Sequence, residues 1–307
     1  MMTRKIRGEL DTAHGVLAYG IGQDGAEIYG YRGKDTEVVV PPIIDGCAVT
    51  HIGKKAFLSN KMLSVISLPE TVVRIDDWAF ACCAKLHKVI LPYHRMEIGQ
   101  GIFKDCFCLE QIVDEGVEER KGRRVDISYL LAATMSRLEA FYLFDFENAG
   151  TVEWLTRWDS RMMSLMEKRD EEGFSKMLLC GEEDYGSKDN NLDYYMEQRR
   201  RDKVRLAMLR LMHDYGLEPS VRGQLEKYLL AHVKGQETEE TWKVILEEYG
   251  DDLCYYQFLT KLGGVTEDNF QAMMEDMGDR HTEMKAYLMK YHSKNHGSEN
   301  AFAAFEL

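Results

Sequence analysis

The chain has 307 residues and a formal net charge of −13 at pH 7, and two domains are expected for a chain of this length. Residues 1–125 contain equal numbers of basic and acidic side chains, so residues 126–307 carry the whole net charge. An acidic surface repels phosphate backbones, which argues against nucleic acid as a partner. No apolar run reaches the ~20 residues of a transmembrane helix, so no membrane partner is expected.

The first residues and the cysteines bear on the compartment in which the protein works. The opening sequence MMTRKIRGEL lacks the apolar core of a signal peptide. Seven cysteines are an odd number, and a chain of this size folds without disulfide bonds, which is typical of a reducing compartment. These two features predict a cytoplasmic location.

Residues 13–40 have the pattern of β-structure. Two alternating segments flank the turn-forming triplet Gln23-Asp24-Gly25, which indicates a hairpin. The segment from Thr36 to Pro41 then reads as a short strand ended by proline. We therefore predict that residues 1–51 form an N-terminal cap and an irregular first coil of the structure that follows.

Residues 52–113 contain a repeat with a period of 23 residues. The aligned positions are Phe57/Phe80/Phe103, Asn60/Cys83/Cys106, Leu63/Leu86/Leu109 and Ile66/Val89/Ile112. A fixed period of this length is the signature of a stacked solenoid. One such coil cannot bury enough apolar surface to be stable alone, so the coils must stack and the ends must be capped. We expect the three phenylalanines to form one inner column.

The pattern I-G-x-x-A-F-x-x-C-x-x-L-x-x-V-x-L-P resembles that of BspA-like leucine-rich repeats, and the resemblance covers about residues 13–113. It implies a curved β-solenoid, with short strands around Leu86 to Leu91 and tight turns or short helices around Ala79-Phe80. It also implies a bacterial protein and a partner that is itself a protein. Many relatives with this repeat are surface proteins.

Outward-facing strand residues of successive coils line up in columns, because side chains alternate between the two faces of a strand. The predicted columns are Ser64/His87/Glu110, Val65/Lys88/Gln111 and Ser67/Ile90/Val113. Ile90 and Val113 form a small apolar stripe among polar neighbours, which suits contact with a partner. We predict that these nine residues form a partner-binding face; the alternative is that so short a face binds nothing.

The repeat brings several cysteines close together. Cys83 and Cys106 occupy an inward position, where cysteine behaves as a small apolar residue. Cys82 and Cys108 lie nearby, but none of the four has the C-x-x-C spacing typical of zinc ligands. We therefore interpret the inward pair as core residues and expect no metal site.

Residues 114–125 are dense in charge and contain two glycines, which predicts a linker. After it the periodicity becomes helical. The predicted helices span about 126–144, from 151 onward, 171–180, 191–214, 219–233, 239–249, 252–262, 267–277 and 281–294. Asp126 is the expected cap of the first helix, which we expect to cover the open end of the last coil.

The helical region, residues 126–307, is expected to consist of antiparallel helix pairs. Residues 265–291 resemble a degenerate ankyrin-type unit that lacks the T-P-L-H signature. Residues 181–190 read as a solvated polar loop without the ligand alternation of a calcium loop. The expected fold class is therefore α+β multidomain, a leucine-rich-repeat β-solenoid followed by an α-helical domain of helix-pair repeats.

Several groups in the helical region are candidate sites. The basic run Arg199-Arg200-Arg201 with Lys203 and Arg205 is expected to pair with local acids rather than to bind phosphate. His292 and His296 have the spacing of two metal ligands but no H-E-x-x-H context, so we expect exposed histidines. Cys180 and Cys254 are expected to be buried and inert, and the methionines from Met273 to Met289 to form helix core.

No catalytic set is recognisable, and the segment from Gly20 to Gly25 lacks the spacing of a phosphate-binding loop. We therefore predict a protein that is not an enzyme, needs no cofactor and binds a protein partner as a scaffold. The alternative is that the helical region is a divergent enzyme or a small-ligand-binding module, recognisable by a deep pocket with convergent polar groups. The sequence leaves the oligomeric state open.

Overall fold

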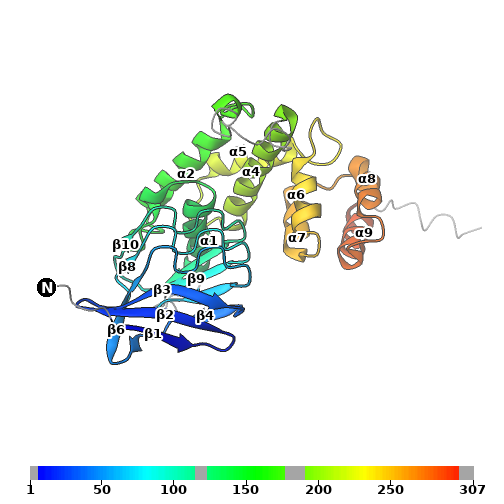
Figure 1. The fold of residues 1–307 in the computed structure, drawn as a ribbon. Helices are drawn as coiled ribbons and strands as arrows, with labels where there is room; N and C mark the ends of the chain where they lie inside the picture. Colours follow the sequence, from blue (N-terminus) through cyan, green and yellow to red (C-terminus); the bar gives the residue numbers. More distant parts are fainter. Residues whose placement is uncertain (1–5, 115–122, 177–190, 297–307) are drawn as a thin grey trace, which may run out of the picture. The chain divides into compact units, whose positions relative to one another are not determined.

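The computed structural model describes residues 6–114, 123–176 and 191–296 (Figure 1). These residues form two compact units. The N-terminal unit contains residues 1–163 and 213–216, and the C-terminal unit contains residues 164–212 and 217–307. Most of the predicted linker 114–125 lies outside the described residues, and the division into 1–51, 52–113, 114–125 and 126–307 stays a prediction.

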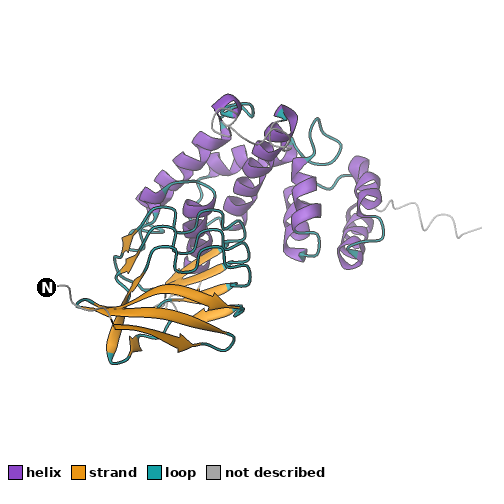
Figure 2. Cartoon of the chain, in the orientation of Figure 1, coloured by secondary structure: helices purple, strands orange, loops and turns teal. Residues whose placement is uncertain are grey.

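The first sheet of the N-terminal unit joins the N-terminal strands to one side of the solenoid (Figure 2). Its strands are β1 (Ile6–Asp11), β2 (Gly15–Gly22), β3 (Gly25–Gly33), β6 (Cys47–Ile52), β8 (Arg74–Ile75) and β10 (Glu97–Ile98), in that order. β1, β2 and β3 are antiparallel, and the later neighbours are parallel. A short strand β5 (Ile43–Ile44) pairs with β6. β1 lies before the segment in which the sequence predicted β-structure.

The second sheet forms another side of the solenoid and contains only parallel strands. These are β4 (Glu37–Val39), β7 (Val65–Ser67), β9 (Lys88–Leu91) and β11 (Gln111–Asp114), ordered β11-β9-β7-β4. Val65 pairs with Lys88 and Lys88 with Gln111, so the strands align at the period of the sequence repeat. The inward side chains are buried, which confirms the predicted β-solenoid; they are Val38, Ile66, Val89 and Ile112.

The phenylalanines of the repeat form a continuous buried stack. The ring centroids of Phe57 and Phe80 are 5.2 Å apart, and those of Phe80 and Phe103 are 5.5 Å apart. Tyr31 extends the stack by one ring, at 5.5 Å from Phe57. The inner column predicted from the period is confirmed, and the N-terminal hairpin supplies a member that the repeat pattern did not reveal.

The Asn/Cys position of each coil also lies inward. Asn60 Oδ1 accepts hydrogen bonds from the amides of Met62 and Leu63. Cys83 and Cys106 are buried, and each thiol donates to a phenylalanine carbonyl of the preceding coil at 3.1 Å. The thiols therefore donate to the preceding coil, whereas Asn60 accepts from its own turn, and the assignment of the two cysteines to the core is confirmed.

Helix α1 (Arg123–Ser136) packs against β11, the last strand of the second sheet. The predicted extension of this helix to Phe144 is wrong. The amides of Leu138 and Ala140 bond back to the carbonyls of Ala133 and Thr134, and Glu139 has a positive φ of 47°. The chain therefore turns after Ser136 and forms the short 3-10 helix η2 (Phe141–Leu143).

Asp126 is not the cap that the sequence predicted, because α1 begins three residues earlier. Its carboxylate instead accepts from the backbone amide of Tyr215 at 3.3 Å and lies 3.2 Å from His213 Nδ1. Residues 213–216 belong to the N-terminal unit. This contact joins segments far apart in the sequence, so the local pattern gave no sign of it.

Helix α2 (Val152–Met166) is fixed to the preceding elements by two tryptophans. Thr151 caps it by accepting from the amide of Trp154 at 3.2 Å. Trp154 Nε1 donates to the Leu143 carbonyl at 2.8 Å, and Trp158 Nε1 donates to the Leu130 carbonyl at 3.0 Å. Both indoles are buried, so α2, η2 and α1 are tied by hydrogen bonds that water cannot reach.

The C-terminal unit is helical, as predicted. Its helices are α4 (Leu192–Met212), α5 (Pro219–Leu230), α6 (Glu240–Glu248), α7 (Leu253–Leu262), α8 (Glu267–Met277) and α9 (Thr282–His296). α4 packs against α5 and α6, and α9 packs against α7 and α8. The predicted helix 171–180 is described only to residue 176, and the predicted loop 181–190 lies outside the described residues. The ankyrin-like assignment stays a prediction.

Helix ends in this unit follow from local signals. Pro219 occupies the first turn of α5, where a missing amide costs nothing. Thr266 and Asn269 form a reciprocal capping box at the start of α8. Gly263 ends α7 with a φ of 80°, a left-handed conformation that glycine adopts readily. These signals are short-range, which explains why the sequence placed the helices well.

Candidate binding surfaces

The outer face of the second sheet carries the nine predicted partner-binding residues. Strand pairing brings Val65, Lys88 and Gln111 side by side, and likewise Ser67, Ile90 and Val113. Ser64 and His87 are hydrogen-bonded through Oγ and Nδ1 at 2.7 Å, and the amide of Glu110 bonds to the His87 carbonyl. Glu110 is exposed and the others are half-buried. The columns exist; their role in binding stays a prediction.

Val39 lengthens the apolar stripe of this face. It pairs with Ser67 in the neighbouring strand and is 64% exposed. The stripe therefore runs through Val39, Ser67, Ile90 and Val113 and is interrupted by one serine. Sequence reasoning omitted Val39, although the strand ended by Pro41 was the signal that could have placed it in the first coil.

A cavity of about 980 Å³ lies elsewhere in the N-terminal unit, beside β10. One wall is the solenoid, through Trp78 and residues 94–96 and 98–101. The other wall is formed by the end of α1 and the segment after it, through Met135, Phe141, Tyr142 and residues 144–148. The volume lies within the range of sites that bind small molecules or peptide segments. No sequence pattern indicated it, because its walls come from segments with different periodicities.

Aromatic side chains dominate the far wall of the cavity. Phe141 and Tyr142 are 54% and 60% exposed, and the rings of Phe144 and Phe146 make an edge contact at 5.2 Å. Asp145 holds the wall in shape, since its carboxylate accepts from the side-chain amide of Asn148 at 2.7 Å and from nearby backbone amides. Because the rings of Phe141 and Tyr142 are already exposed, a ligand in the cavity can contact their apolar surface without any local unfolding of the protein.

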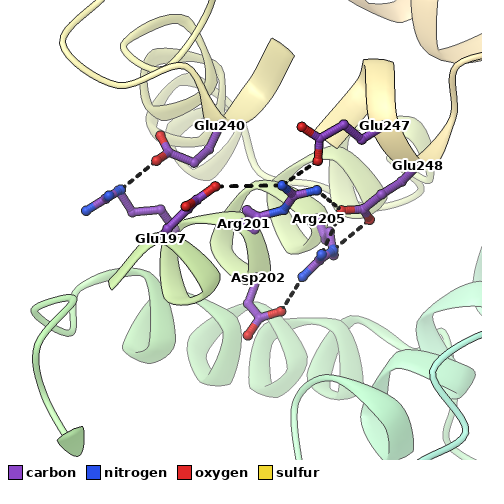
Figure 3. A network of polar contacts seen from close by, with 8 residues as sticks. Glu197, Arg201, Asp202, Arg205, Glu240, Glu247 and Glu248 are labelled. Atoms are coloured by element: carbon purple, nitrogen blue, oxygen red, sulfur yellow. Dashed lines mark hydrogen bonds and ion pairs between the residues drawn. The ribbon is translucent and has the colours of Figure 1, made fainter. Parts of the chain in front are cut away.

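The basic run on α4 pairs with acids of the same unit, as predicted (Figure 3). Arg201 is 2.7 Å from Glu247 and from Glu248, and Arg205 contacts Glu248 at 2.7 Å. The remaining ion pairs are Arg200 with Asp170 and Glu240, Arg201 with Glu197, Lys203 with Asp170, and Arg205 with Asp202. Arg199 lies over the ring of Tyr195. The basic run therefore holds α4 against α6 and against the segment that precedes α4.

Replacing Glu248 with glutamine is expected to destabilise the C-terminal unit by about 2 kcal/mol at neutral pH, because two largely buried guanidinium groups lose their shared partner. Burial raises the pKa of Glu248, but hydrogen bonds from Arg205 and Arg201 outweigh burial and hold the pKa below its usual value. The stabilisation is therefore complete above the unfolded-state pKa of about 4.3 and is lost as the pH falls through the lower folded-state value.

Urea unfolding of wild type and Glu248→Gln at pH 7 and below pH 4 measures this effect. The difference between the two proteins should shrink in acid. Glu226→Gln, which removes an exposed pair with Arg222 at 3.8 Å, is the matched control and should cost no more than about 0.5 kcal/mol. Equal losses of unfolding free energy for the two variants would show that the partly buried network stabilises the unit no more than an exposed ion pair does.

Two expectations about single residues are wrong. His292 is not a freely exposed histidine, because its ring stacks on Phe270 with 3.9 Å between centroids. Cys254 is exposed rather than buried. The side chain of Asp252 caps α7 by accepting from the amide of Cys254, the second residue of the helix. The charge of Asp252, with a smaller effect of burial, raises the pKa of the Cys254 thiol.

The remaining candidates divide between the core and undescribed positions. Met273, Met274, Met277 and Met284 are buried, as the core interpretation predicts, whereas Met289 is half exposed. Cys180 and the side chain of His296 lie outside the described residues. Within the described ranges, no three His, Cys, Asp or Glu side chains gather as a metal site would require. None of the described helices has the length and apolarity to cross a bilayer.

Comparisons with known proteins bear on the solenoid. Residues 43–118 match the family model described as "BspA type Leucine rich repeat region (6 copies)". The chain is similar to the crystal structure of a leucine rich cell surface protein from Faecalibacterium prausnitzii, with 24% identity and a TM-score of 0.30 over 35% of this chain. The match spans 30% of that protein's length.

Two further solved structures show similarity in the same part. A leucine-rich repeat protein of T. pallidum is 25% identical, with a TM-score of 0.23, over 34% of this chain and 71% of that one. A leucine-rich repeat protein from Bacteroides capillosus is 18% identical, with a TM-score of 0.25, over 35% of this chain and 99% of that one. No curated protein sequence matches the chain significantly.

The repeat period, the parallel strands and the buried phenylalanine stack agree with the family match. Phe57, Phe80 and Phe103 all lie within the matched residues. The chain therefore carries a BspA-type leucine-rich repeat region at residues 43–118, followed by a helical C-terminal region.

Proposed function

We propose that this protein is a non-enzymatic scaffold that binds a protein partner through the outer face of the second sheet. The observation that carries the proposal is the alignment of Val39, Ser67, Ile90 and Val113 across β4, β7, β9 and β11. Parallel pairing fixes these side chains on a rigid surface. The scaffold therefore loses little conformational entropy when a partner binds them.

The polar columns beside the stripe supply the second part of a typical interface. His87 and Lys88 lie next to the apolar residues, and Glu110 adds a charge of opposite sign. An apolar centre with a polar rim is the usual composition of a specific protein contact. We infer a folded partner, because the face is a sheet surface whose side chains point outward. We place this work in the cytoplasm.

Ile90→Lys is expected to abolish partner capture, since it buries a charge at the centre of the contact. The full chain serves as bait in an extract of the source cells, and recovered proteins are quantified for wild type and variant. A partner retained by wild type should fall at least about tenfold with Ile90→Lys.

Val73→Lys is the matched control for this experiment. Val73 is a half-exposed valine next to β8 of the first sheet, so the substitution adds the same charge away from the proposed face. Partner recovery should stay unchanged with Val73→Lys. The proposal is wrong if the two variants lose the partner equally, or if wild type retains no protein above the level of an unrelated bait.

The alternative function, an enzyme or small-ligand module in residues 126–307, stays a prediction. The feature that favours it is the cavity beside β10, because residues 135, 141, 142 and 144–148 form one of its walls. One carboxylate that lines it, Asp145, already accepts from Asn148 and the backbone of its own turn. Because these hydrogen bonds occupy the Asp145 carboxylate, the cavity is better suited to binding a ligand than to acid-base catalysis.

A further inference from the structure

Each coil of the first sheet is hydrogen-bonded to the coil that follows it. The Ile75 carbonyl accepts from the Gly99 amide at 2.7 Å, and the Trp78 amide donates to the Gln100 carbonyl at 3.0 Å. β8 thereby forms the edge on which β10 is built. The backbone groups that make these bonds repeat every 23 residues, so the last coil presents equivalent groups on its own outer edge.

The equivalent groups of the last coil are the Ile98 carbonyl and the Gly101 amide. β10 pairs with β8 and ends its sheet. Among residues 6–114, 123–176 and 191–296, no residue bonds to either group. The edge of the second sheet is different, because α1 packs against β11. Among the described residues, the helical cap therefore protects one edge of the last coil, and the other edge is available as a template for a further strand.

The cavity of about 980 Å³ lies at this open edge. Residues 98–101 line it, and the exposed rings of Phe141 and Tyr142 stand on the opposite wall. The edge offers hydrogen bonds to a backbone, and the rings offer apolar surface to side chains. A strand added to a sheet edge makes both kinds of interaction, because its backbone bonds to the edge and its alternate side chains enter pockets.

The charges at the cavity are of both signs. Arg95 on the solenoid wall and Glu147 on the opposite wall are exposed, and neither forms an ion pair with any residue in the described part of the chain. An extended segment with one acidic and one basic side chain complements them, whereas a uniformly charged ligand meets repulsion on one wall. The site therefore fits a mixed-charge polypeptide better than a nucleic acid or a simple anion.

We propose that the cavity beside β10 binds an extended segment of a partner protein, which adds as a strand to the open edge of the last coil. The segment carries bulky apolar side chains at alternate positions and charged residues between them. The site is separate from the outer face of the second sheet, and either proposal can hold without the other.

The probe is a labelled synthetic peptide with the sequence of Arg95 to Lys104, RMEIGQGIFK, which is mixed in charge and apolar at spaced positions. This segment makes the required bonds to the preceding coil inside the protein, so it tests the chemistry of the edge directly. Fluorescence anisotropy with the full chain should show saturable binding. The control peptide has Glu97→Pro and Gly99→Pro, which removes the two amides that donate to the Val73 and Ile75 carbonyls in the fold, and it should bind at least about tenfold more weakly.

Protein variants locate the binding. The double variant Phe141→Asp/Tyr142→Asp should weaken peptide binding at least about tenfold, because the rings lose their apolar surface. Phe107→Asp is the matched control, since Phe107 is 78% exposed and does not line the cavity. Ile90→Lys, on the other proposed face, should leave peptide affinity unchanged. Thermal unfolding of each variant verifies that the N-terminal unit is intact.

Hydrogen exchange distinguishes strand addition from simple occupation of the cavity. Bound peptide should slow exchange of the Gly101 amide at least about tenfold, because that amide becomes a donor to the added strand. Equal affinity of the two peptides, unchanged binding to the double variant, or unchanged exchange at Gly101 would each overturn the proposal. If the chain self-associates and Tyr142→Asp makes it monomeric, the occupant is a second copy, and the partner-segment proposal is overturned.

Discussion

Phe80→Ala is expected to lower the free energy of unfolding of the N-terminal unit by about 4 kcal/mol. Phe80 is fully buried and lies between Phe57 and Phe103 at centroid distances of 5.2 and 5.5 Å. Its removal loses apolar burial and leaves a void between two rings that parallel strand pairing holds apart. Urea unfolding followed by far-UV circular dichroism measures the loss.

Phe107→Ala is the matched control, because it deletes the same side chain from an exposed position of the last coil. Its effect should stay within about 0.5 kcal/mol. Phe57→Ala should resemble Phe80→Ala, since Phe57 is also stacked on both sides, by Tyr31 and Phe80. A cost below about 1 kcal/mol for Phe80→Ala would contradict the view that the ring stack stabilises the solenoid.

A chain truncated after residue 125 is expected to lose cooperative unfolding and to aggregate. α1 packs against β11, and its buried residues Leu130 and Leu131 belong to the same compact unit as the solenoid. Without α1 the last coil exposes apolar surface and an unprotected strand edge, which is a template for association. Thermal unfolding and light scattering test this expectation.

Truncation after residue 166 is the matched control, because it keeps α1, η2 and α2 and the tryptophan hydrogen bonds that tie α2 to η2 and to α1. That fragment should melt cooperatively. In the full chain, Leu130→Ala should cost about 3 kcal/mol, since Leu130 is fully buried. A soluble fragment of residues 1–125 with a cooperative melt would show that the solenoid needs no helical cap.

The proposed outer face and the proposed strand site use the solenoid in different ways. The outer face uses side chains that the repeat places in columns, as with Ser67, Ile90 and Val113. The site beside β10 uses backbone groups of the last coil that bond to no described residue. A chain with more coils would extend the outer face and move the strand site to its new last coil. The peptide experiment and the Ile90→Lys experiment therefore report on independent features.

The sequence by itself determined the solenoid, because a 23-residue period leaves one solution for burying Phe57, Phe80 and Phe103. It also determined most helix positions in the C-terminal unit, since Pro219, Thr266 and Gly263 act within one helical turn. Periodicity and capping are local, so they can be read without knowing which segments meet.

Only the tertiary structure decided what the non-repeating residues do. Tyr31 joins the ring stack, Asp126 bonds to the Tyr215 amide instead of capping a helix, and His292 stacks on Phe270. The cavity beside β10 exists because α1 stops at Ser136 and the following turn places its aromatic residues opposite the solenoid. These features depend on contacts between segments far apart in the chain, and no local pattern encodes the partner in such a contact.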